Sequence, residues 1–188
     1  MIEKCTTKSW ETSLYEPQKL YYNLMGEKIL TDKNVKSAYY MAKHKKSCDS
    51  PAWDGMTRTI LVDGMEPEHA GSLIRYHVLH GPSGCVKRFD IPKSNGKTRP
   101  ISIYPLLDRV AQWCIMEPLR KACGPLLSPI NHAFLKGKSC KTAFEAFPPA
   151  GEASYVICGD IHSFFDTVSH SLVRACLWSA GIRDSQLL

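Results

Sequence analysis

The stretch SYVICGDIHSFFD, residues 154–166, decides the fold of this chain. Its apolar beginning predicts a short strand over 154–161 that places the carboxylate of Asp160 at the strand's end. Burying a carboxylate is costly unless it meets a cation. Where a strand leaves a sheet, such a group is a candidate metal ligand for phosphoryl chemistry. Taken by itself, Asp160 could also cap a helix or lie in a turn.

Length and composition limit the possible size, class and location of the protein. A chain of 188 residues suits one medium domain, or one domain with part of another, and 44% hydrophobic residues can supply a core. No apolar run reaches the length of a membrane span, and the N-terminus lacks the apolar segment of a signal peptide. The eight cysteines form no C-x-x-C pair, which favours reduced thiols. We therefore expect a cytoplasmic protein without a membrane partner.

Positive charge is concentrated in three places. The net charge is +6 and the pI is about 8.9. The clusters lie within 36–46, 87–99 and 136–141. Any one cluster could be a solvated face, but three in a small basic chain favour contacts with nucleic acid. The candidate nucleic-acid-binding residues are Lys87, Arg88, Lys97, Lys136 and Lys138.

Helical patterns surround one pair of strands, which predicts an α+β fold. Pro67 suits the first turn of a helix, Gly81 and Pro82 suit its end, and Pro118 should kink or divide another. The loop at 50–57 follows from its Pro, Asp and Gly content. The expected helices span 17–25, 33–46, 66–80, 106–123, 138–147 and 169–181.

A β-hairpin is expected from strands at 86–93 and 98–103 around an Asn-Gly turn. A two-residue loop would pair Ile91 with Pro100 and Asp90 with Ile101, which would put core-facing and solvent-facing side chains on the same face. A three-residue loop over 95–97 pairs Ile91 with Ile101 and keeps the apolar residues together. Since a slip of one residue moves every side chain to the other face, we prefer the three-residue loop.

This register also sets Lys93 directly opposite Arg99. Like charges that face each other across a ladder are unfavourable unless an anion lies between them. The pairing therefore suggests a phosphate clamp at the tip of the hairpin.

Six motifs occur in an order and at spacings that resemble the fingers and early palm of bacterial reverse transcriptases of the group II intron or retron type. Each motif is short, and their ordered occurrence carries the resemblance. They are WDGMT at 53–57, IPKSNGKTRPISI at 91–103, LDRVAQ at 107–112, SPINHAFLKGKS at 128–139, DIHSFFD at 160–166 and HSLV at 170–173.

The resemblance implies a fingers subdomain over 1–150 and the beginning of a right-hand polymerase palm over 151–188. It implies an RNA-directed DNA polymerase in the full-length protein, a nucleotidyltransferase that uses two metal ions. The implied cofactor is Mg²⁺, and the implied partners are an RNA template, a DNA or RNA primer and dNTPs. Intron RNA and retron RNA are further partners of the types it resembles.

The same resemblance assigns roles to single residues. Asp160 would be the catalytic carboxylate that binds metal, assisted by the backbone carbonyl of Ile161. Lys93 and Arg99 would hold the triphosphate of the incoming nucleotide, and Phe165 would lie beside its sugar. A guanidinium offers a fixed fork to phosphate oxygens, and an ammonium offers a mobile point charge.

One departure from the family concerns catalysis. The family's second metal motif is Y-x-D-D, and this sequence contains no Asp-Asp pair. We therefore expect the N-terminal part of a longer polymerase, inactive alone because one aspartate cannot assemble a two-metal site. The alternative is a non-catalytic, maturase-like RNA-binding module. The sequence leaves open which kind of retroelement is the source.

Overall fold

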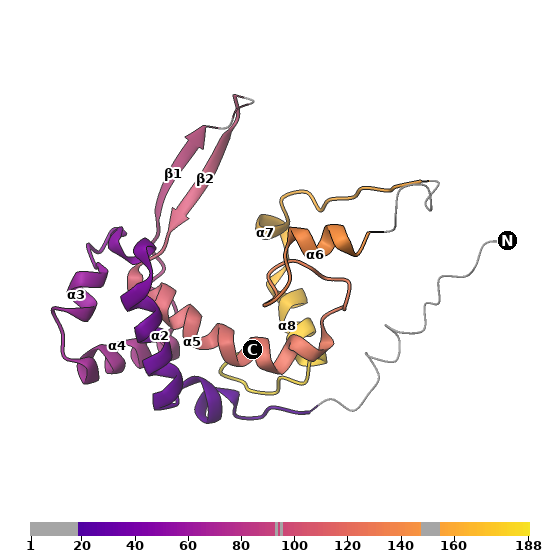
Figure 1. Ribbon diagram of the computed structural model, residues 1–188. Coiled ribbons are helices and arrows are strands. Elements are labelled where there is room, and N and C mark those ends of the chain that lie inside the picture. The colour runs from indigo at the N-terminus through magenta and orange to yellow at the C-terminus, as the bar shows by residue number, and fades with distance from the viewer. Residues whose placement is uncertain (1–18, 93, 95, 148–154) are drawn as a thin grey trace. The chain divides into compact units, whose positions relative to one another are not determined.

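The computed structural model describes residues 19–92, 94, 96–147 and 155–188 (Figure 1). The fold is α+β, with helices and one antiparallel hairpin. The chain divides into two compact units. The first consists of residues 21–121 with 184–188, and the second, called the 122–183 unit, of the described residues within 122–183 together with residues 19 and 20. Each unit is treated by itself below.

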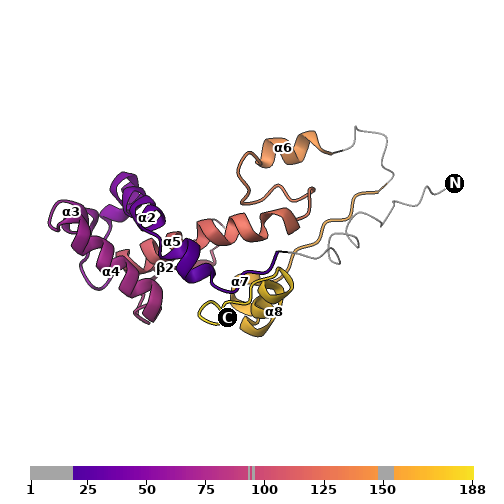
Figure 2. The same ribbon diagram turned by 90° about the horizontal axis from the view of Figure 1, so that it is seen from below.

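The 21–121 unit is built on helices α2 (Asp32–His44), α3 (Arg58–Val62) and α4 (Pro67–His80), which pack side by side (Figures 1 and 2). Helix α5 (Leu106–Cys123) completes it. Apolar residues recur at helical spacing, and these faces form the core. The buried residues include Val35, Ala38, Ala42, Leu61, Ala70, Ile74, Val78, Leu106, Val110 and Cys114.

The helices expected at 33–46, 66–80 and 106–123 are confirmed. Gly81 ends α4 with φ at 78°, a value that glycine adopts without strain. The helix expected at 17–25 is wrong for its described part, because a π-helix, η1 (Met25–Ile29), begins where it should end. Ahead of this helix, the side-chain oxygen of Asn23 accepts from the N–H of Gly26 at 3.0 Å. Helix α3 was not expected.

Pro118 lies inside α5, and the helix is not divided there. A proline has no N–H, so the carbonyl of Cys114, four residues earlier, loses its partner within the helix. The side chain of Asn34 replaces that partner, because its Nδ2 donates to the Cys114 oxygen at 2.8 Å. The same nitrogen also donates to the Ile29 oxygen at 2.8 Å. One amide therefore joins η1, α2 and α5. Burial raises the pKa of the Cys114 thiol to about 11, so this sulfur stays neutral at physiological pH.

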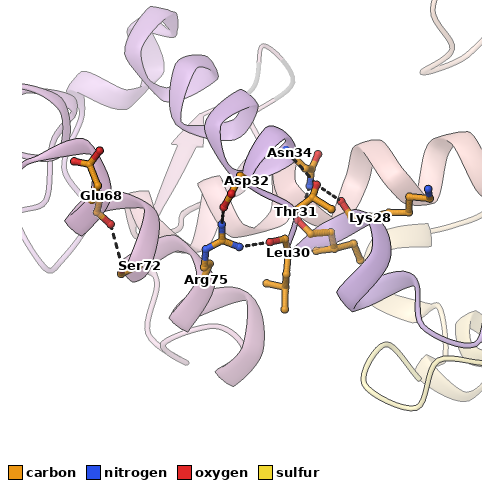
Figure 3. A network of polar contacts seen from close by, with 9 residues as sticks. Lys28, Leu30, Thr31, Asp32, Asn34, Glu68, Ser72 and Arg75 are labelled. Atoms are coloured by element: carbon orange, nitrogen blue, oxygen red, sulfur yellow. Dashed lines mark hydrogen bonds and ion pairs between the residues drawn. The ribbon is translucent and has the colours of Figure 1, made fainter.

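Arg75 on α4 makes the corresponding link to the beginning of α2 (Figure 3). Its guanidinium pairs with the Asp32 carboxylate and donates to the backbone oxygen of Leu30. Thr31 caps α2, because its hydroxyl oxygen accepts from the N–H of Asn34 at 3.4 Å. These bonds fix the start of α2 against α4.

The hairpin consists of β1 (Lys87–Pro92) and β2 (Thr98–Ile103), and it projects from the helices of its unit (Figure 1). Phe89 pairs with Ile101 and Ile91 pairs with Arg99. The register that paired Ile91 with Ile101, and set Lys93 opposite Arg99, is therefore wrong.

The observed register is shifted by two residues from the expected one, and the physical reason is the period of a strand. A shift of two keeps every side chain on the same face, so the apolar pattern cannot tell these registers apart. The last pair of the ladder is Pro92 with Thr98, and Gly96 in the connection adopts a left-handed φ of 75°. Lys93 itself lies outside the described residues.

The 122–183 unit contains the short helices α6 (Cys140–Glu145), α7 (Phe164–Thr167) and α8 (His170–Ser179). Ser139 and Thr142 form a capping box that begins α6, so the helix starts two residues later than expected. It also ends two residues early, at Glu145. Helix α8 confirms the expected 169–181 helix, and α7 was not expected.

The strand expected at 154–161 is wrong. The described residues 155–161 have no regular secondary structure, and Tyr155 and Ile157 are 90% and 95% exposed. A strand needs a neighbour for its backbone hydrogen bonds. Among the described residues, β1 and β2 pair only with each other.

Also within the described residues, no helix combines the length and apolar character needed to cross a membrane.

The Asn34 contact can be tested with a double-mutant cycle. We expect Asn34→Ala to lower the free energy of unfolding by about 1–3 kcal/mol, because two carbonyls lose their donor. In a Pro118→Ala background the new backbone N–H at position 118 can bond the Cys114 oxygen, so the cost of Asn34→Ala should fall by about 1 kcal/mol. Urea unfolding measures both differences, with Lys33→Ala as an exposed control on α2. An equal cost in both backgrounds would show that Asn34 does not compensate for the proline.

Candidate functional site

One face of the hairpin combines cations with apolar side chains. Because paired residues share a face, Lys87 lies at the base of this face and Arg99 near its tip. Phe89 and Ile91, between them, are 41% and 45% exposed. Arg88 lies on the opposite face, and Lys97 is exposed in the loop. The hairpin therefore presents an amphipathic, positively charged surface.

The loop before β1 is fixed by a buried carboxylate. Asp108 on α5 is 2% exposed. It accepts from the backbone N–H of Ser83 at 3.1 Å and from the Ser83 hydroxyl at 2.8 Å. His77 Nδ1 on α4 lies 3.0 Å from the other carboxylate oxygen. Trp53 adds a second attachment, because its indole N–H donates to the Cys85 oxygen at 3.1 Å.

Arg109, the next residue along α5, holds a different loop. Its guanidinium donates to the backbone oxygens of Ser47 at 2.9 Å and Ser50 at 3.4 Å. The segment that it holds contains the 3₁₀-helix η2 (Lys46–Asp49). The adjacent residues Asp108 and Arg109 thus hold two different loops against α5. The sequence predicted this pair as part of a motif but did not predict these contacts. The position of Asp108 beside the apolar residues of its helix could have indicated that its carboxylate is buried.

Asp160 lies in the irregular segment, and its carboxylate is exposed. Ile161 follows at 65% exposure, and Phe165 in α7 is 83% exposed. The rings of Phe164 and Phe165 meet edge to face, 5.5 Å apart. Ser163 precedes α7 with a left-handed φ of 49°. The structure therefore places the three predicted site residues Asp160, Ile161 and Phe165, all exposed, on one short segment.

The described side chains around Asp160 do not form a metal site by themselves. Mg²⁺ prefers six oxygen ligands in octahedral geometry. Across the described ranges, no group of three or more His, Cys, Asp or Glu side chains could hold a metal ion. One carboxylate and one backbone carbonyl leave most of the shell unfilled. A metal bound at Asp160 would need further oxygen ligands.

The third basic cluster belongs to a loop with unusual backbone angles. Phe134 and Gly137 both adopt positive φ, at 58° and 79°. The Lys138 ammonium donates to the Pro129 oxygen at 3.1 Å, which ties it to its own loop. Lys136 is exposed. Of this pair, Lys136 is the cation more available to a phosphate.

The structure brings the predicted site residues together in two groups. Lys87, Arg88, Lys97 and Arg99 share the hairpin of the 21–121 unit. The residues Asp160, Ile161, Phe165, Lys136 and Lys138 belong to the 122–183 unit.

Comparison with known proteins identifies relatives. A family model described as reverse transcriptase (RNA-dependent DNA polymerase) matches residues 91–187. Protein YkfC of Escherichia coli (strain K12) is 30% identical over 136 residues, which is 68% of this chain. An uncharacterized 91 kDa protein in the cob intron of Schizosaccharomyces pombe is 30% identical over 103 residues, or 54% of this chain. The group II intron-encoded protein LtrA of Lactococcus lactis subsp. cremoris is 31% identical over 87 residues, or 45% of this chain.

These relatives are much longer than the matched region. The alignment covers 35% of YkfC, 13% of the cob intron protein and 14% of LtrA. The matched part of this chain thus spans about a third or less of each relative.

The buried carboxylate at the root of the hairpin gives a testable expectation. Asp108→Ala should lower the free energy of unfolding by about 3 kcal/mol, because the part-buried donors of Ser83 and His77 lose their common acceptor together. Ser83→Ala removes only the hydroxyl and should cost about 1 kcal/mol. Thermal and urea unfolding measure both, with the exposed Glu66→Gln as the control. Equal losses for the two variants would mean that the backbone N–H and His77 contribute nothing to this contact.

Proposed function

This chain belongs to the reverse transcriptase family, and we propose that it supplies the fingers subdomain, residues 1–150, and the beginning of the palm, residues 151–188, of an RNA-directed DNA polymerase. The match over residues 91–187 carries the proposal, because it begins in the hairpin and runs through Asp160 and past the end of α8. The family is defined by nucleotidyl transfer onto a primer along a nucleic-acid template and generally uses divalent metal ions.

The proposed roles follow the chemistry of the side chains. Asp160, with the Ile161 carbonyl, would contribute to a Mg²⁺ site completed by other oxygen ligands. Lys93 and Arg99 would hold the nucleotide triphosphate, and Phe165 would contact the nucleotide sugar. The exposure of Arg99, Asp160 and Phe165 supports these roles, since all three side chains are accessible to a ligand.

The remaining cations would contact the template and primer. Phosphate contacts fix a nucleic acid on a protein without reading its sequence. The proposed contact residues are Lys87, Arg88, Lys97, Lys136 and Lys138. Intron RNA or retron RNA would be bound by the same charges.

We further propose that these 188 residues do not polymerise alone. Two-metal nucleotidyl transfer needs carboxylates on both ions, and the sequence contains no Asp-Asp pair. The matched region is also a minor part of each relative reported above.

Primer extension tests this expectation directly. The purified chain, with an RNA template, an annealed primer, dNTPs and Mg²⁺, should give no product above a heat-inactivated control. Extension above that control would contradict the proposal that further carboxylates are required.

In a protein that carries this sequence together with the remaining parts of a polymerase, two substitutions should separate the proposed roles. Asp160→Asn should lower kcat by about a thousandfold, because metal stabilisation of the transition state is worth several kcal/mol. Arg99→Ala should mainly raise the KM for dNTP and lower kcat/KM about tenfold to a hundredfold. Asp63→Asn, an exposed carboxylate in the 21–121 unit, serves as the control. Unchanged dNTP dependence in Arg99→Ala would rule out the triphosphate role.

A second candidate function is RNA binding without catalysis. The exposed cations of the hairpin favour it, and it needs no metal. The two proposals differ in one observation: Asp160→Asn lowers the kcat of a polymerase about a thousandfold but leaves the RNA affinity of a binding module unchanged.

A further inference from the structure

A groove lies between α2 and α4, within the 21–121 unit and apart from the residues assigned above. Its volume is about 560 Å³, inside the usual range for ligand sites. Part of its rim is visible in Figure 3, where Asp32, Glu68, Ser72 and Arg75 are labelled. We call it the α2–α4 groove and define it by Lys36, Tyr40, Lys43, Glu68, Gly71 and Arg75.

A glycine keeps the groove open. Gly71 has no side chain, and the nearest atom that a Cβ at this position would meet is Val35 Cγ1, at 3.9 Å. The neighbouring Ser72 hydroxyl turns to its own helix and donates to the Glu68 backbone oxygen at 3.0 Å. Gly71 and Ser72 therefore leave room in the groove between α2 and α4.

One stripe of α2 faces this groove with two cations and an aromatic ring. Lys36, Tyr40 and Lys43 are spaced by four and three residues, so they lie on one helix face along about 10 Å of its axis. The Tyr40 side chain is 55% exposed. Throughout the described part of the chain, no carboxylate pairs with the ammonium group of Lys36 or Lys43.

The other charges of the groove largely cancel. Asp32 is paired with Arg75, so these two side chains together add no net charge. Glu68 is the remaining carboxylate against two lysines. The groove thus offers positive charge on both sides of an exposed aromatic ring.

We propose that the α2–α4 groove binds a single-stranded nucleic acid, with a base stacked on Tyr40 and the flanking phosphates held by Lys36 and Lys43. Cationic grooves that interleave aromatic side chains are the general solution for single strands, because every base has a face to stack. A duplex hides those faces, so it is the poorer occupant. The inference shares with the proposed function only a nucleic-acid partner, and it uses different side chains from the hairpin.

The test measures binding of the full chain to a fluorescent oligouridylate of about 12 nucleotides by anisotropy. Tyr40→Ala should weaken binding about fivefold to a hundredfold, whereas Tyr40→Phe should bind like the parent. Because Tyr40 is uncharged, Tyr40→Ala should leave the slope of log K against log salt unchanged. Lys36→Ala and Lys43→Ala should each reduce that slope by about 0.7. An abasic oligomer of the same length should bind the parent and Tyr40→Ala equally.

Filling the groove separates binding from folding. Gly71→Leu places a side chain in the hollow and should weaken binding as much as Tyr40→Ala does. Gly71→Ala is the matched control, because the added methyl fits and a helix prefers alanine to glycine. It should raise the melting temperature by about 2 °C and leave affinity unchanged.

Two results would overturn the inference: full affinity in Tyr40→Ala and Gly71→Leu, or an equal loss on the abasic oligomer. Lys87→Ala and Arg88→Ala, which change two proposed nucleic-acid contacts of the hairpin, are measured beside them. Loss of affinity in the hairpin variants alone would reject the groove and support the proposed hairpin contacts. Full affinity in both sets would reject the groove and the proposed nucleic-acid contacts of the hairpin together.

Discussion

The side-chain amide of Asn34 satisfies the backbone oxygen that Pro118 leaves unpaired in α5, and the arrangement of the 21–121 unit depends on this bond. The same nitrogen reaches the Ile29 oxygen, so a single group fixes η1, α2 and α5. Arg75 fixes α4 to the start of α2 through Asp32. Asp108 and Arg109 on α5 hold the neighbouring loops. The helix that positions these loops therefore has the unpaired oxygen at Cys114 satisfied by Asn34.

The helices of the unit hold the loop that leads into the hairpin, whereas the two strands are largely exposed. Asp108 and Trp53 hold the loop that leads into β1, whereas Phe89 and Ile91 stay exposed on the strand itself. An exposed amphipathic face with cations at both ends suits a surface that meets a charged ligand. The α2–α4 groove is a second, different kind of surface in the same unit, since a missing side chain creates it and a helix stripe supplies its charge.

The two units differ in how far they bury their apolar residues. Helices α2 and α4 bury one face each, whereas α6 and α8 bury none of their residues. The segment with Asp160 has the apolar composition of a strand and none of the hydrogen bonds of one within the described residues. A strand is defined by its neighbour, so composition alone could not predict its state. The sequence context predicted the candidate carboxylate, that of Asp160. It could not predict the other ligands of a metal bound there.

By itself, the sequence determined the family, the α+β class and the helices at 33–46, 66–80 and 106–123, because periodicity, caps and ordered motifs are local properties. It also determined which face of the hairpin is apolar. The expected and observed registers of the hairpin differ by two residues and place the same side chains on that face. Only the tertiary structure therefore decided between them. Likewise, only packing could show that Asn34 completes α5 and that Gly71 opens a groove, because each effect needs a second helix far away in the sequence.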